Sequence, residues 1–170
     1  MKSFTYIRLA LVALLSMVAL LAAPTTASAE PRPSGCKICT KYFLVDWTKK
    51  TDVVDWDHRL GVCSAGSDGV KCSITSGRTA TRTIATSFGL SNDWVAGELN
   101  ISSSSSQSVS VGCNTVTLKK GQKLEAYPLG SRHKYRIKKI SWWPSRSETT
   151  LSGWKYTYNP YKTGIHCRIV

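Results

Sequence analysis

The pattern of apolar and polar residues between positions 72 and 113 predicts one long β-hairpin. Asn92-Asp93 is a turn-favouring pair. If the chain folds back at this pair, the residue numbers of any two directly opposed residues add up to 185. Cys72 then lies opposite Cys113 and predicts a disulfide at the hairpin base. Apolar residues take even positions before the turn and odd positions after it, which puts them on one face. These residues are Ile74, Ala80, Ile84, Phe88, Leu90, Val95, Leu99, Ile101, Val109 and Val111.

Short apolar or alternating segments elsewhere predict further β-strands and no helix. Residues 42–45 and 53–56 predict two strands joined by the polar residues 48–51. Residues 116–119, 123–127 and 132–140 follow Cys113 and are separated by glycine- and proline-containing turns. We therefore predict an all-β, elongated, sandwich-like single domain with one long disulfide-stapled hairpin.

The first residues have the features of an export signal. Lys2 and Arg8 precede an apolar run over residues 9–23, and the small residues 27–29 suit a cleavage site. The run is too short to span a bilayer. We expect residues 1–29 to be a signal peptide, residues 30–35 a flexible arm containing two prolines, and residues 36–170 one secreted domain.

All six cysteines follow the expected cleavage point, which in an exported chain indicates three disulfides. The hairpin register pairs Cys72 with Cys113 and leaves the pairing of Cys36, Cys39, Cys63 and Cys167 open. The spacing of Cys36 and Cys39 also occurs in redox and zinc sites. Because no second closely spaced pair completes a zinc site, we expect structural bonding, with no metal or other cofactor.

Positive charge is concentrated in the C-terminal third of the chain. The net charge is +13, and residues 114–170 contain twelve Lys or Arg against two Glu. Residues 30–113 contain nine basic and eight acidic residues. This distribution predicts a polyanion-binding surface, the alternative being simple solubility.

A basic strand is the candidate for that surface. Arg132, Lys134, Arg136 and Lys138 alternate with other residues, which places them on one strand face about 6.6 Å apart, and Lys139 follows directly. We expect these five residues to bind an anionic cell surface, such as an anionic glycan or lipid, or nucleic acid. The alternative is an edge strand that uses lysines against aggregation.

The Ser/Thr-rich hairpin, followed by Val116-Thr117-Leu118-Lys119-Lys120-Gly121 and Tyr127-Pro128-Leu129-Gly130, resembles the insertion region of aerolysin-type β-pore-forming proteins. The resemblance covers residues 72–140. It implies that the hairpin tip enters a membrane after oligomerisation. The alternative is that the apolar face packs on a second sheet of the same domain, and Arg78 and Arg82 on that face oppose deep insertion. The predicted tip comprises Phe88, Leu90, Trp94 and Val95.

No motif in the chain indicates catalysis. The enzyme alternative is a small secreted ribonuclease that uses His58, beside Asp55 and Asp57, together with His133. We expect instead a non-enzymatic toxin or toxin-complex component that binds an anionic surface or a partner protein. A structural adaptor or inhibitor subunit is the alternative. The C-terminal tryptophans and tyrosines form either core or a stacking platform, and we favour core.

Overall fold

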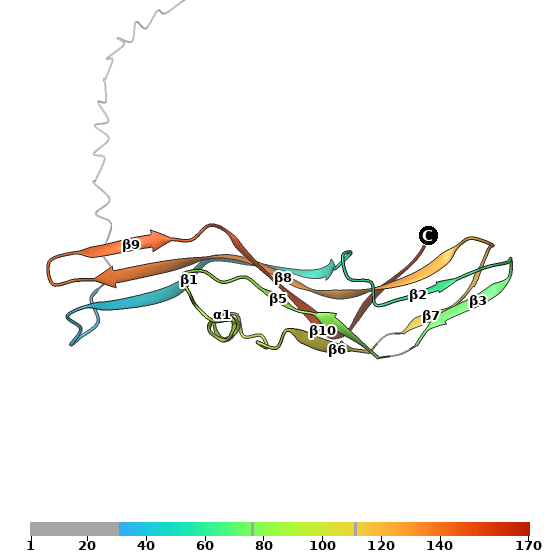
Figure 1. The fold of residues 1–170 in the computed structure, drawn as a ribbon, viewed down its shortest axis with the longest axis horizontal. Coiled ribbons are helices and arrows are strands. Elements are labelled where there is room, and N and C mark those ends of the chain that lie inside the picture. Colours follow the sequence, from blue (N-terminus) through green and yellow to red (C-terminus); the bar gives the residue numbers. More distant parts are fainter. Residues whose placement is uncertain (1–30, 76, 111) are drawn as a thin grey trace, which may run out of the picture. The chain divides into compact units, whose positions relative to one another are not determined.

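A computed structural model describes residues 31–75, 77–110 and 112–170 of the chain (Figure 1). The chain divides into one unit of residues 1–33 and a second of residues 34–170, and every described strand and helix lies in the second. The expected signal peptide, residues 1–29, lies outside the described residues. Residues 31–38 contain neither helix nor strand. No helix in the described ranges is long and apolar enough to cross a membrane.

Strand β8 (Lys123–Trp142) is the centre of a six-stranded antiparallel sheet (Figure 1). The long strand β1 (Cys39–Val54) pairs along one side of β8, and β10 (Lys155–Ile169) pairs along the other. Three shorter strands complete the sheet: β2 (Gly61–Ser64), β5 (Thr83–Ile84) and β9 (Ser147–Leu151). β2 and β9 pair with opposite ends of β8, and β5 pairs with β10. Because β8 has partners on both sides, the interpretation of its lysines as protection of an edge strand is wrong.

Two small antiparallel sheets accompany the large one. β3 (Val70–Ile74) pairs with β7 (Cys113–Leu118), and β4 (Arg78–Thr81) pairs with β6 (Ser106–Val109). A single short helix, α1 (Asn92–Leu99), interrupts the strands of the described residues. The prediction of an all-β fold is confirmed.

The larger apolar core lies between the β3–β7 pair and the end of the large sheet that contains β2. Side chains from both layers meet there, as in a sandwich. Its fully buried members include Cys72, Cys113, Leu118, Leu124 and Ala126. The apolar face predicted from alternation therefore does face inward, toward a second layer of strands.

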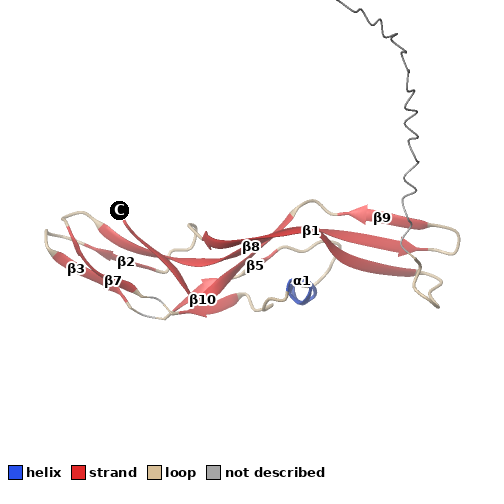
Figure 2. Cartoon of the chain, turned by 180° about the vertical axis from the view of Figure 1, so that it is seen from behind, coloured by secondary structure: helices blue, strands red, loops and turns tan. Residues whose placement is uncertain are grey.

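Helix α1 packs against one face of the large sheet (Figures 1 and 2). Val95 is fully buried against Tyr135 and Ile137 of β8. The Ser91 side chain caps the helix by accepting a hydrogen bond from the Trp94 N–H at 3.2 Å. Asn100 ends the helix in the left-handed conformation. Packing of Val95 supplies the stabilisation that an isolated eight-residue helix lacks.

The predicted continuous hairpin is wrong. Its two arms do pair, but in pieces: Arg78 lies opposite Val109, and Cys72 lies opposite Val116. In the β4–β6 pairs, the numbers of opposed residues add up to 187 instead of the predicted 185. Because side chains alternate with a period of two residues, a shift of two leaves every side chain on its predicted face. Asn92 begins a helix instead of a turn, because Ser91 caps that helix and the sheet buries Val95.

The predicted hairpin tip does not project. Val95 is buried in the core, and Phe88, Leu90 and Trp94 are packed against it and against the β8 residues beneath. Phe88 and Trp94 each lie 6.3 Å from the Tyr42 ring between centroids. These apolar side chains are the ones that cover the sheet, which is why they are not available at a tip.

The predicted disulfide between Cys72 and Cys113 is also wrong. Cys72 bonds to Cys63, and Cys113 bonds to Cys167, with Cα–Cα distances of 5.8 and 5.9 Å. Both residues point into the core, toward the facing layer, so their partners lie on strands of that layer and not on the neighbouring strand. Both bonds therefore join the two layers of the sandwich.

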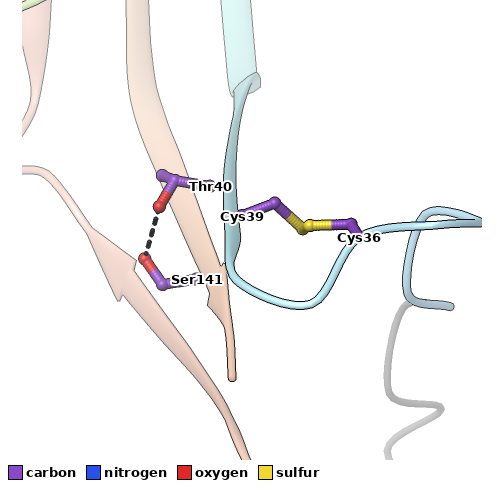
Figure 3. The surroundings of a disulfide bond; sticks show 4 residues. All are labelled: Cys36, Cys39, Thr40 and Ser141. Carbon is purple, nitrogen blue, oxygen red and sulfur yellow. Dashed lines mark hydrogen bonds between the residues drawn. A yellow bond between two sulfur atoms is a disulfide. The ribbon is translucent and has the colours of Figure 1, made fainter. Parts of the chain in front are cut away.

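The third disulfide joins Cys36 to Cys39 at the start of β1 (Figure 3). Beside it, the hydroxyl groups of Thr40 and Ser141 lie 3.0 Å apart and tie β1 to the far end of β8. The expectation of three disulfides is confirmed, and the Cys36–Cys39 bond is one of the pairings that the sequence left open. Three disulfides are consistent with an extracellular protein.

Strand β1 is one strand where the sequence predicted two. Residues 48–50 continue the ladder with β8, and register shifts occur on either side of them. Asp46 and Asp52 adopt positive φ values of 53° and 55° at these shifts. Aspartate tolerates this conformation better than most residues, so the two irregularities are absorbed within a continuous strand.

Candidate functional site

The four alternating basic residues of β8 lie on one face of the large sheet, and we call them the cationic row: Arg132, Lys134, Arg136 and Lys138. Between them, Tyr135 and Ile137 are fully buried under α1. Arg132 is exposed and the other three are half-buried. Strand alternation therefore directs the cationic row to the face opposite α1, as the sequence predicted.

Strand β1 places one further cation, Lys50, beside the cationic row. Lys50 is exposed and lies directly opposite Arg132 in the ladder. Like charges in directly opposed positions destabilise a sheet. Sequence reasoning missed Lys50 because residues 48–51 were predicted to join two strands, although the β-favouring residues Thr48, Thr51 and Val53 are compatible with one strand.

Aromatic rings hold three members of the cationic row. The Lys134 Nζ lies 4.1 Å from the Trp154 ring centroid, and the Arg136 guanidinium lies 5.3 Å from the same centroid. The Lys138 Nζ lies 5.2 Å from the Phe43 ring centroid. Cation–π contacts of this kind fix the direction of otherwise mobile side chains.

One carboxylate contacts the cationic row from β1. An Oδ atom of Asp46 lies 3.7 Å from a terminal nitrogen of Arg136, and the Asp46 side chain is 52% exposed. An exposed ion pair at this distance contributes little to stability. Asp46 therefore reduces the local positive charge without fixing the fold.

Lys139 belongs to the other face of the sheet. It lies opposite Tyr42 in the ladder, and its Nζ lies 6.0 Å from the Phe88 ring centroid on the α1 side. The structure therefore separates Lys139 from the four other residues predicted to bind polyanions.

A cavity of about 490 Å³ adjoins the Arg132 end of the cationic row. Its lining comes from the loop after β1 and from β5, β8 and β10, four segments far apart in the chain. The lining residues are Asp55, Asp57, His58, Thr83, Arg132, Tyr156, Thr157 and Tyr158. The volume is within the range of small-ligand sites.

The carboxylate of Asp55 organises the loop side of this cavity. One oxygen lies 2.9 Å from His58 Nδ1, and the other accepts a hydrogen bond from the Asp57 N–H at 3.2 Å. Both oxygens of Asp55 are thus engaged within the loop. The Asp57 carboxylate and the His58 Nε2 are the groups of this loop that can face a ligand.

Tyr158 forms the buried wall of the cavity. Burial, followed by the nearby charge of Asp55, raises the pKa of Tyr158, so its hydroxyl stays protonated and donates to the Pro128 carbonyl at 3.0 Å. The ring crosses Gly130, where an added Cβ would lie 2.8 Å from the Tyr158 Cζ. Only glycine permits this approach of the Tyr158 ring to the backbone of β8.

His133 does not join His58 in a common site. It is 2% exposed, does not line the cavity, and stacks under Trp47 with ring centroids 6.4 Å apart. Burial, followed by the charge of Lys49, lowers the pKa of His133 and favours the neutral imidazole. The ribonuclease alternative required both histidines at one phosphate, and the structure does not bring them together.

The C-terminal aromatic residues divide between core and surface. Trp142 and Tyr158 are buried, as favoured from the sequence. Trp154 and Tyr156 are 45% and 50% exposed. Tyr156 lies opposite Lys134 in the ladder, so its ring is on the same face as the cationic row.

Comparison of the chain with protein families, with curated proteins and with solved structures finds no match in any of the three. The resemblance to aerolysin-type proteins therefore rests on sequence pattern alone. Within residues 31–75, 77–110 and 112–170, no group of three or more His, Cys, Asp or Glu side chains could hold a metal ion.

Proposed function

We propose that this is a secreted, non-enzymatic protein that binds polyanions along the cationic row. The observation that carries the proposal is the alignment of four basic side chains on one face of the central strand, with Lys50 beside them. Alternate residues of a strand lie about 6.6 Å apart, so a linear anionic polymer can contact several of these cations in succession.

The arrangement of charge supports binding in preference to simple solubility. Solubility depends on net charge and does not require two cations to lie side by side, whereas here Lys50 and Arg132 are directly opposed. Such a pair is unfavourable in the free protein, and a bound anion between the two relieves the repulsion. Polymer binding also releases counterions, so affinity falls steeply with salt.

The aromatic contacts of the cationic row reduce the entropic cost of binding. Trp154 and Phe43 already restrict Lys134, Arg136 and Lys138 before any ligand arrives. A side chain that is ordered in advance loses less conformational freedom when it binds. The row is therefore a prepared surface for repeated anionic groups.

The test is salt-dependent retention on immobilised heparin and binding to a fluorescent single-stranded DNA oligonucleotide. Replacing the cationic row with serine should lower the heparin elution salt markedly. For DNA, the slope of log K against log salt is negative, and it should become less steep by about 0.7 for each cation removed.

A matched control removes the same charge from exposed lysines of other segments: Lys71, Lys119, Lys120 and Lys162. It should retain most of the binding. Equal losses in the two variants would show that net charge alone is responsible and would refute a defined surface.

Membrane insertion by residues 84–101 stays a prediction from sequence. Their apolar side chains are packed on the sheet, so binding along the cationic row does not require them to move. The toxin and adaptor roles are both compatible with a protein that first attaches to an anionic cell surface.

A further inference from the structure

The cavity beside the cationic row has a mixed lining that differs from the row itself. Arg132 and His58 provide nitrogen donors, whereas Asp57 provides a carboxylate acceptor and Tyr156 a half-exposed ring. Asp55 is already committed to His58 and to the Asp57 N–H. The lining combines two carboxylates with one guanidinium and one imidazole, so the cavity is not simply a further anion site.

This combination of groups suits a hydroxyl-rich ring. A free carboxylate accepts hydrogen bonds from two neighbouring hydroxyl groups, and a guanidinium donates to hydroxyl and ring oxygens. A tyrosine ring offers an apolar face for the C–H face of a sugar. A volume of about 490 Å³ accommodates one or two such rings.

Arg132 links the cavity to the cationic row, because it is the terminal residue of the row and also lines the cavity. A ligand that uses both must present anionic groups at intervals and hydroxylated rings between them. An acidic or sulfated glycan has both features in one chain.

Single-stranded nucleic acid fits the surface less well. Its binding sites combine basic residues with open aromatic faces on which bases stack. Beside the cationic row, Trp154 already contacts Lys134 and Arg136, and Phe43 contacts Lys138. Of the rings named on this face, Tyr156 at the cavity is half-exposed, so bases would find one ring to stack on and not a series along the row.

On this basis, and resting on the proposed function, we infer that the polyanion is an acidic glycan, one sugar ring of which enters the cavity at Arg132. Asp57 accepts hydrogen bonds from its hydroxyl groups, and Tyr156 packs against its face. The cationic row binds the sulfate or carboxylate groups of the following sugars.

The test uses the variant Asp57→Asn. For this variant, a sugar site in the cavity predicts weaker glycan binding, whereas simple electrostatics predicts tighter binding. Removing a negative charge beside a cationic surface should strengthen the binding of any polyanion. Loss of a charged hydrogen-bond acceptor should instead weaken the binding of a size-defined heparin oligosaccharide about tenfold. Binding of a single-stranded DNA of similar length should be unchanged or tighter. Tyr156→Ala, which leaves the charge unaltered, should show the same selective loss for the oligosaccharide.

Asp46→Asn is the matched control, because Asp46 contacts Arg136 outside the cavity and asparagine also tolerates its positive φ. It should tighten the binding of both ligands. Unchanged or tighter heparin binding by Asp57→Asn, or an equal loss for DNA, would overturn the glycan inference. Failure of the unaltered protein to bind any polyanion would instead refute the proposed function.

Discussion

Arg82 is a buried cation whose removal should destabilise the fold. Its side chain makes hydrogen bonds to Asn159 Oδ1 at 2.7 Å, to the Ser104 and Ser106 carbonyls at 2.6 and 3.3 Å, and to Gln107 Oε1 at 3.0 Å. Arg82 is 5% exposed, and burial lowers the pKa of its guanidinium. The residue therefore ties the serine-rich segment after α1 to β10.

Arg82→Met keeps an unbranched apolar side chain and removes every donor. Three of the four bonds are 3.0 Å or shorter, and a hydrogen bond that involves a charged group contributes about 1.5–3 kcal/mol. The variant no longer has to bury a charged guanidinium away from water, and this offsets several kcal/mol of the loss. We expect a net loss of about 3 kcal/mol in the free energy of unfolding. For a domain of this size this lowers the melting temperature by about 10 °C.

The measurement is urea denaturation followed by tryptophan fluorescence, with Arg78→Met as the control. Arg78 is exposed at the start of β4, so the same substitution there should cost less than about 0.5 kcal/mol. Amide exchange should also become faster in residues 104–107 of Arg82→Met. Equal stability of the two variants would refute the view that the buried hydrogen bonds of Arg82 hold this segment.

Four further changes test other parts of the fold. Hydrogen bonds from Tyr127, Arg59 and Arg168 lower the pKa of Glu125 from 4.5 to about 2, so its ionised form stabilises the protein above about pH 4.5 and this contribution is lost as pH falls toward 2. Stability of Glu125→Gln, measured by urea denaturation, should therefore depend less on pH across that window, and an unchanged pH dependence would contradict the assignment. Replacing the Cys113–Cys167 pair, whose members are 54 residues apart, with serine should cost about 4 kcal/mol. Replacing the Cys36–Cys39 pair, three residues apart, should cost about 2 kcal/mol in the same assay, and the reverse order would exclude the loop-entropy explanation. Val95→Ala should cost about 2 kcal/mol and increase proteolysis within residues 85–105, and full resistance would show that Val95 does not anchor α1.

Alternation predicted the facing of strand residues well, because it follows directly from strand geometry. The faces of Arg132, Lys134 and Tyr135 and the inward direction of Cys72 and Cys113 were all predictable. Alternation does not predict which strands pack against the inward face. The disulfide partners were therefore missed, since a residue that points inward meets another sheet and not its strand neighbour.

Helix α1 and the cavity were missed for different reasons. The helix had local signals, in the Ser91 cap and the four-residue spacing of Val95 and Leu99, but the turn-favouring pair Asn92-Asp93 was given more weight. The cavity had no local signal beyond the acidic loop around His58. Its walls come from the loop after β1 and from β5, β8 and β10, and the pairings of β8 with β1 and β10 and of β10 with β5 bring these segments together.

The central position of β8 also sets the order in which the chain acquires its structure. β1 is the first strand to be synthesised, yet Thr40 meets Ser141, which lies 101 residues later. Until β8 has been synthesised, β1 has no strand to pair with. Its unpaired backbone N–H and C=O groups can then form hydrogen bonds with other molecules. High contact order makes such assembly slow. The chain therefore completes its sheet only after nearly all of it has been made, and crowded nascent copies risk associating through β1 before then.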